Sequence, residues 1–110
     1  MEQEQVVGGP RDGERETRDI RIQIWPYRSD MGVVSWWESD TRLTVSVVDY
    51  SFGREIEIQG NRAGLISLAR DLLTLAQEGA PNKSDILLDS DGLDGESETL
   101  RMMVCEPWGQ

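Results

Sequence analysis

The sequence predicts an α+β fold: an antiparallel sheet of about five or six strands with one long amphipathic helix packed on one face. Three observations predict this class. Several short segments alternate apolar and polar residues, as half-buried strands do. Residues 62–78 instead repeat leucines at helical spacing. The 110 residues include 37% hydrophobic side chains, which suits one folded domain.

The first seventeen residues differ from the rest of the chain. They are polar, rich in glycine and without a sustained hydrophobic period. Such a segment buries too little apolar surface to offset the entropy that it loses on ordering. We therefore expect a disordered N-terminal tail over residues 1–17 and a single α+β domain over residues 18–106.

Four alternating segments precede the helix. Residues 19–24 place an isoleucine at every second position, and residues 33–37 read as a weaker strand. Residues 42–48 and 55–58 alternate again and are close enough in sequence to form a hairpin. The inward face of the predicted sheet comprises Ile20, Ile22, Ile24, Leu43, Val45, Val47, Ile56 and Ile58.

The helix over residues 62–78 has clear end signals, with Asn61 as its N-cap and Gly79 and Pro81 after its last turn. An amphipathic helix buries its apolar side, and each buried leucine contributes roughly 1.5–3 kcal/mol. We therefore expect Leu72→Asp to unfold or badly destabilise the domain. The side expected to face the sheet carries Leu65, Leu68, Ala69, Leu72, Leu75 and Ala76, and the side expected to face solvent carries Ser67, Arg70, Thr74, Gln77 and Glu78.

Two further strands are predicted after the helix. Residues 85–89 are a short apolar run, and residues 98–105 alternate once more. Between them, residues 90–97 form an acidic loop with two glycines. The order of elements favours an antiparallel arrangement with short connections.

Composition excludes several kinds of function. The chain has no histidine, which removes His-dependent catalysis and His-ligated zinc, and Cys105 is its only cysteine. Its 21 Asp and Glu against 11 Lys and Arg give a net charge of −10, the wrong sign for a nucleic-acid partner. No segment is long and apolar enough for a membrane span, and no signal peptide is evident. We expect a cytoplasmic protein without cofactor, metal or catalytic residues.

The acidic loop is the most conspicuous candidate site. Calcium is one interpretation, but Leu93 and Leu100 fall where an EF-hand needs oxygen ligands. The alternatives are a solvated connection and a recognition surface for a basic partner. The acids assigned to partner binding are Asp89, Asp91, Asp94, Glu96 and Glu98.

Tryptophan is unusually frequent, with four residues against a single phenylalanine. If residues 33–37 are a strand, Trp36 and Trp37 point to opposite faces, so one indole is exposed. Tryptophan is enriched among interface anchors. We therefore add Trp36 and Trp37 to the predicted partner-binding residues, with core packing as the alternative.

Residues 57–76 contain a strand end followed by Asn61-Arg62-Ala63-Gly64-Leu65 and a leucine-rich helix. Ile86 to Asp89, Gly92-Leu93 and Leu100 to Val104 follow in the order short strand, turn and closing strand. Over roughly residues 54–105 this pattern resembles bacterial polymorphic-toxin immunity family number thirty-two. Members often carry histidines before the turn, where Lys83-Ser84-Asp85 stands here. The resemblance implies a small α+β antidote that binds a cognate toxin and has no catalytic residues.

We therefore predict a non-enzymatic immunity protein that binds a cognate, basic protein toxin. An alternative is a small structural or regulatory subunit that acts through homodimerisation of exposed strand edges, with Met103 and Cys105 outward. A small hydrolase is a third possibility, which requires a pocket with two carboxyl groups, at least one of perturbed pKa.

Overall fold

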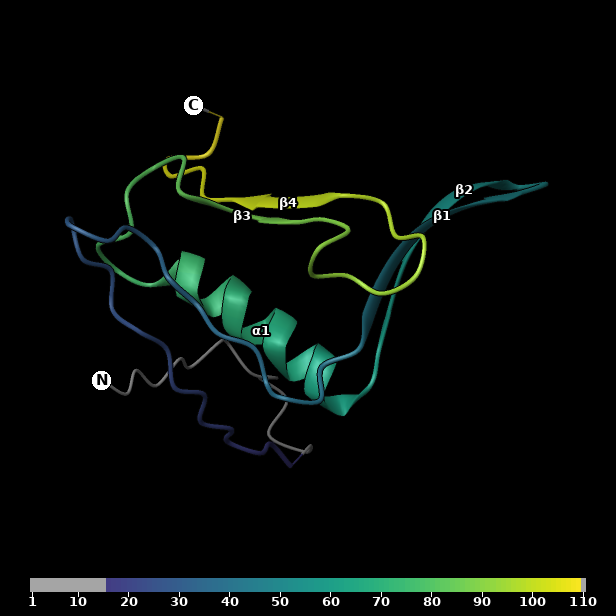
Figure 1. The fold of residues 1–110 in the computed structure, drawn as a ribbon. Helices are drawn as coiled ribbons and strands as arrows, with labels where there is room; N and C mark the ends of the chain where they lie inside the picture. Colours follow the sequence, from purple (N-terminus) through teal and green to yellow (C-terminus); the bar gives the residue numbers. More distant parts are fainter. Residues whose placement is uncertain (1–15, 110) are drawn as a thin grey trace.

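The computed structural model describes residues 16–109, in which one helix and four strands are present (Figure 1). Most of the predicted tail, residues 1–15, lies outside the described residues. No helix of the described part has the length and apolar character that a membrane crossing requires. In chain order the elements are β1 (Leu43–Tyr50), β2 (Gly53–Gly60), α1 (Arg62–Ala76), β3 (Asp85–Leu88) and β4 (Leu100–Met103).

The chain is α+β, but the predicted single sheet of five or six strands is wrong. Two separate two-stranded antiparallel sheets form instead, β1–β2 and β3–β4. Residues 19–24 and 33–37 form no strand, although Ile24 is buried. The helix is also shorter than predicted, with 15 residues, because Gln77 already has an extended backbone and ends it.

The two sheets stay separate because residues 94–98, which run beside β1, complete only half of a ladder. The N–H groups of Asp94 and Glu98 donate to the carbonyl oxygens of Leu43 and Val45 at 2.8 and 2.7 Å. The N–H groups of Leu43 and Val45 donate to side chains instead, to Asp94 Oδ2 at 2.7 Å and to Ser97 Oγ at 3.2 Å. Side-chain acceptors replace the carbonyls that a continuous sheet needs.

The predicted orientation of α1 is also wrong. The buried positions of the helix are mainly polar, whereas Leu65, Ile66 and Leu72 are each more than 40% exposed. Residues 16–40 cover the polar side, so that α1 lies between this segment and the β3–β4 sheet (Figure 1). The buried polar side chains of α1 and its C-cap are Ser67, Arg70, Asp71, Thr74 and Gln77.

Hydrogen bonds to backbone groups of the covering segment explain why polar side chains are buried there. The Gln77 amide donates to the Trp25 carbonyl at 3.1 Å and accepts from the Tyr27 N–H at 2.8 Å. The Glu38 N–H donates to Ser67 Oγ at 2.8 Å. A buried polar group is tolerated where it is hydrogen-bonded, so the segment satisfies its backbone on the helix instead of in a sheet.

The junction of β2 and α1 explains the Asn-Arg-x-Gly sequence. The Asn61 side chain accepts from the N–H groups of Gly64 and Arg42 at 2.7 and 3.0 Å and donates to the Asp40 carbonyl at 2.7 Å. A Cβ atom on Gly64 would lie 2.0 Å from the Arg42 carbonyl oxygen. The cap was therefore predicted correctly, and the glycine permits the close approach of helix and strand.

The apolar core is small and lies where the two sheets approach each other. Leu43, Val45, Leu88 and Leu93 are buried together, and Leu68 supplies the contact from α1. Trp37, Ile86, Leu100 and Met102 pack around this cluster while keeping partial exposure. The acidic loop is thus tied to the core through Leu93.

Candidate partner-binding surface

The acidic loop, defined here as residues 89–98, has a defined backbone. Leu93 is only 6% exposed and anchors the loop in the core. The N–H groups of Gly92 and Leu93 donate to the Asp89 carbonyl at 3.0 and 2.8 Å, and the Asp91 N–H donates to Asp89 Oδ1 at 3.0 Å. This is an Asx turn, in which the Asp89 side chain organises the loop.

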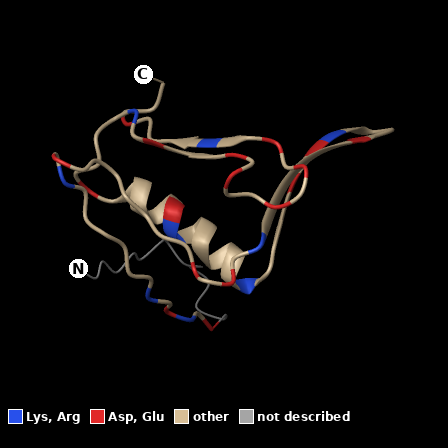
Figure 2. Cartoon of the chain, viewed as in Figure 1, with Lys and Arg blue, Asp and Glu red and all other residues tan. Residues whose placement is uncertain are grey.

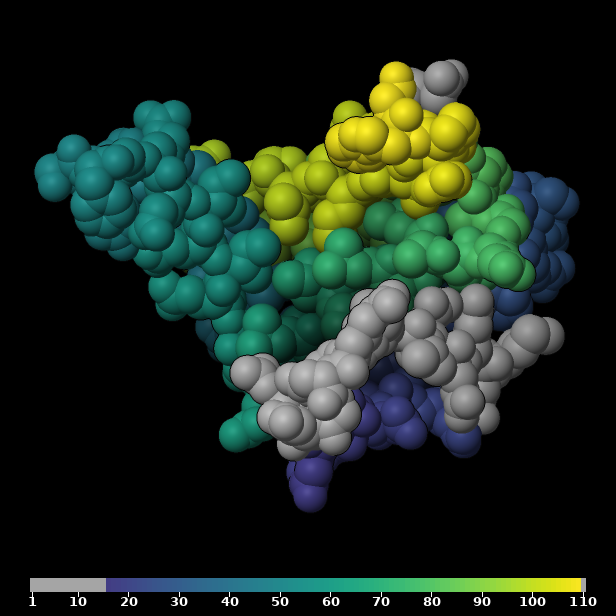
Figure 3. Space-filling view, turned by 180° about the vertical axis from the view of Figure 1, so that it is seen from behind, coloured from purple at the N-terminus to yellow at the C-terminus, as the bar shows by residue number. Residues whose placement is uncertain are grey.

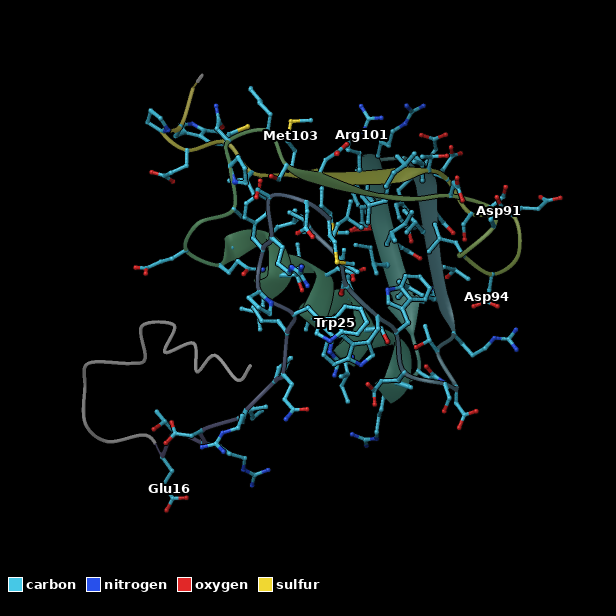
Figure 4. All side chains as sticks on the ribbon, turned by 60° about the vertical axis from the view of Figure 1, so that its left-hand side comes forward. Glu16, Trp25, Asp91, Asp94, Arg101 and Met103 are labelled. Atoms are coloured by element: carbon cyan, nitrogen blue, oxygen red, sulfur yellow. The ribbon has the colours of Figure 1, made fainter. Side chains whose placement is uncertain are left out.

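Asp94 has a second internal role. Its carboxylate accepts from the Leu43 N–H at 2.7 Å and pairs with Arg42 Nε at 3.0 Å, so it joins the loop to β1. The structure therefore divides the five predicted acids. Asp89 and Asp94 hold the loop, whereas Asp91, Glu96 and Glu98 are exposed. Figure 2 shows several acidic positions along this part of the chain. Asp91 projects away from the body (Figure 4).

Trp36 and Trp37 are half-buried and lie at the interface between residues 16–40 and α1. The Trp37 indole N–H donates to Asp71 Oδ2 at 2.9 Å. The Arg70 guanidinium lies 4.3 Å from the centre of the Trp36 ring, which also contacts Trp25 at 4.8 Å. These contacts stabilise the fold. Partner binding by this pair, and by the loop, stays a prediction.

Arg70 and Asp71 are both buried, although Arg70 was predicted to face solvent and Asp71 was assigned to neither side of the helix. Arg70 Nη1 donates to Glu38 Oε2 at 2.8 Å, and its Nε donates to the Gln23 carbonyl at 3.1 Å. Burial raises the pKa of Asp71, which the Trp37 hydrogen bond, the nearby Ser35 hydroxyl and the Arg70 charge oppose only in part. The available signal was that Ser67, Arg70, Asp71, Thr74 and Gln77 also recur at helical spacing.

An open hollow of about 440 Å³ borders this layer and includes Asp71 and Asp85 in its lining. It is the feature closest to the predicted hydrolase pocket, since it has two carboxyl groups and one has a raised pKa. Asp71 is only 1% exposed, however, and Asp85 pairs with Arg101 at 3.2 Å. This hollow therefore does not present the pair of accessible, facing carboxylates that glycoside hydrolysis uses.

The loop acids do not converge on a metal position. Within residues 16–109 no group of three or more Asp, Glu or Cys side chains is arranged to hold an ion. The Asp89 and Asp94 side chains instead accept hydrogen bonds from backbone N–H groups, and these bonds fix the shape of the loop. The arrangement presents separated carboxylates to the outside, which suits contacts with basic side chains.

Comparison with known proteins gives one family match, which lies in the C-terminal half of the chain. The model of the family Immunity protein 32 matches residues 55–106, 52 of the 110 residues. This confirms the resemblance predicted from the sequence, and it supports a role as an immunity protein. No curated protein and no solved structure gives a significant match to the chain.

The matched segment contains most of β2, together with α1, β3, the acidic loop and β4. It therefore includes the Asn61–Gly64 junction and every predicted acid of the loop. The segment over residues 16–40, which covers the polar side of α1, lies before the match.

Proposed function

We propose that this protein is a non-enzymatic, cytoplasmic immunity protein of a bacterium, which neutralises a basic toxin by direct binding. The observation that carries the proposal is the match to Immunity protein 32 over the segment that holds the acidic loop. A second observation supports it: Asp91, Glu96 and Glu98 are exposed on a loop whose position is held by Leu93, Asp89 and Asp94.

A held loop suits this function for an energetic reason. Binding costs less when the contact side chains are carried on a backbone that is already ordered. The three exposed carboxylates also add to a net charge of −10, which steers a basic partner during diffusion. Neutralisation then follows from occupation of the toxin's active site or an adjacent surface.

The test is charge reversal of the exposed loop acids. We expect the triple substitution Asp91→Lys, Glu96→Lys and Glu98→Lys to slow association with the toxin domain encoded by the adjacent gene by about tenfold or more at low salt. The thermal midpoint should stay nearly unchanged, since these side chains make no internal contacts described in the structure. Stopped-flow mixing measures the association rate.

The matched control places the same three charges elsewhere. Glu16, Asp19 and Glu78 are exposed and lie away from the loop, so their triple change to Lys alters net charge equally. Only a loss confined to the loop variant supports a contact surface there. Equal slowing in both variants would show that net charge acts without a local site.

Homodimerisation is the alternative, and one observation favours it. Leu87 and Met103 are 46% and 43% exposed on the outer side of β3–β4. Light scattering of the purified chain at micromolar concentration distinguishes the two functions. A tight dimer, with no toxin gene adjacent, supports the structural subunit, whereas a monomer that binds the neighbouring toxin domain supports immunity.

A further inference from the structure

The outer half of β1 is an open strand edge. Successive residues of an antiparallel strand direct their N–H and C=O groups to opposite edges. Leu43 and Val45 direct theirs away from β2, to residues 94–98. Val47 and Asp49 direct theirs to that same edge, but their backbone groups have no hydrogen-bond partner there among residues 16–109.

The reason is that residues 94–98 diverge from β1 after Val45. Their last bond to the strand is from the Glu98 N–H to the Val45 carbonyl. Beyond that point the hairpin projects from the body, as the teal strands show in Figures 1 and 3. The edge next to Val47 is therefore accessible along its length to another extended segment.

The same hairpin face exposes apolar side chains next to this edge, and the exposed Asp49–Arg54 ion pair follows them toward the tip of the hairpin. Val45, which is buried, and Val47 share this face with their cross-strand partners Ile58 and Ile56. The exposed fractions are 40% for Val47, 42% for Ile58 and 68% for Ile56. An edge strand with exposed apolar side chains favours pairing with another strand, and its side chains would pack on alternate residues of that strand.

Charge decides which kind of strand fits. Glu96 and Glu98 lie where residues 94–98 leave β1, and Glu55 and Glu57 lie on the opposite face of the hairpin. A second copy of this chain would bring another net charge of −10 to this region. A strand from a basic protein would instead be attracted.

We infer that the edge of β1 beside Val47 accepts one extended strand of the toxin, which extends the β1–β2 hairpin to three strands. The inference rests on the proposed function and adds the binding mode. The bound strand alternates apolar residues, packed beside Val47, with basic residues near Glu98. Main-chain hydrogen bonds supply part of the affinity, as in other cases of strand addition.

The experiment removes a single edge donor. Proline lacks the N–H and is tolerated where that group faces outward from an edge strand. Val47→Pro should weaken binding of the toxin domain encoded by the adjacent gene about ten- to hundredfold, because a buried carbonyl of the bound strand loses its donor. Ile56→Pro is the matched control, since Ile56 faces Val47 but directs its N–H to the far edge. Its dissociation constant should change by less than about threefold.

Hydrogen exchange of the unaltered chain gives a second measurement that does not depend on the variants folding. The amides of Val47 and Asp49 should exchange rapidly in the free protein and be protected in the complex. If the parent binds but Val47→Pro binds equally well and neither amide is protected, the edge inference is overturned and the immunity function stands. If the parent does not bind the toxin domain, the edge inference and the proposed immunity function are both overturned. Protection in the free chain that rises with its concentration would assign the edge to a second copy and overturn the inference.

Discussion

Gly64 illustrates how one residue decides the position of a helix. The carbonyl oxygen of Arg42 approaches so closely that a Cβ at this position would lie 2.0 Å away. The nearest obstacle is backbone, which cannot rotate away as a side chain would. The Asn61 side chain holds the backbone around Arg42 in place, since it accepts from the N–H groups of Gly64 and Arg42 and donates to the Asp40 carbonyl. The strand-to-helix junction is therefore tightly specified.

We expect Gly64→Ala to lower the free energy of unfolding by about 3 kcal/mol, because the helix must move to relieve the clash. Gly92→Ala is the control, since a Cβ there would meet only Trp37 at ordinary contact distance, 3.6 Å. Urea denaturation followed by circular dichroism measures both. Equal stabilities for the two variants would contradict the close approach.

Asp71 shows the cost of burying an ionised group. Burial raises its pKa in the folded protein above the unfolded value of 3.8. In the interval between the two values the folded state binds more protons than the unfolded state, so this residue's contribution to stability falls as the pH rises through it. The contribution is most favourable below that interval and is lost above the folded pKa.

We therefore expect Asp71→Asn to be as stable as the parent or more stable at pH 7, because an amide still accepts from Trp37 without a buried charge. The stability of the parent relative to the variant should decline as the pH rises from below 3.8, the unfolded value, to 7. Thermal unfolding of the parent and of Asp71→Asn across this pH range tests the prediction. A variant that is much less stable at pH 7 would show that the Arg70 charge needs this carboxylate.

At the scale of the element, α1 reverses the usual arrangement because its covering segment offers backbone groups rather than apolar side chains. Residues 16–40 form no strand, and their carbonyl and N–H groups bond to Arg70, Ser67 and Gln77. The helical period of the leucines located the helix. A set of polar residues on α1 recurs with the same period, so periodicity alone does not show which set is buried. The choice between them depended on the partner, which no local pattern describes.

A pair of substitutions tests this orientation. Leu75 is 5% exposed and Leu72 is 49% exposed, so the expected unfolding by Leu72→Asp no longer holds. We expect Leu75→Asp to cost about 3 kcal/mol or more and Leu72→Asp less than about 1 kcal/mol. Chemical denaturation measures both variants. A larger loss of unfolding free energy in Leu72→Asp than in Leu75→Asp would support burial of the leucine-rich side, as the sequence predicts.

At the scale of the whole molecule, the net charge of −10 acts on encounter with a partner more than on the fold. Surface ion pairs such as Arg54–Asp49, with both side chains about 70% exposed, contribute little to stability. The exposed loop acids and the open edge of β1 lie on neighbouring parts of the surface, since Glu98 bonds to Val45. In the proposed complex, steering and docking would therefore use adjacent groups.

The rate of toxin association should consequently depend on salt. We expect it to fall about tenfold between low ionic strength and about 0.5 M salt, as screening shortens the reach of the carboxylates. The dissociation rate should change much less, since pairing at the β1 edge does not depend on distant charges. Surface plasmon resonance at several salt concentrations measures both rates, and a salt-independent association rate would argue against steering.

The sequence by itself determined the hairpin of β1 and β2, the helix with its Asn61 cap, the acidic loop and the family resemblance, because each depends on residues close together in the chain. Only the tertiary structure decided which side of α1 is buried, that residues 94–98 separate the two sheets, and that Asp89 and Asp94 hold the loop. Those outcomes depend on hydrogen bonds between segments up to about fifty residues apart, whose partners are chosen by satisfaction of buried polar groups and not by local periodicity.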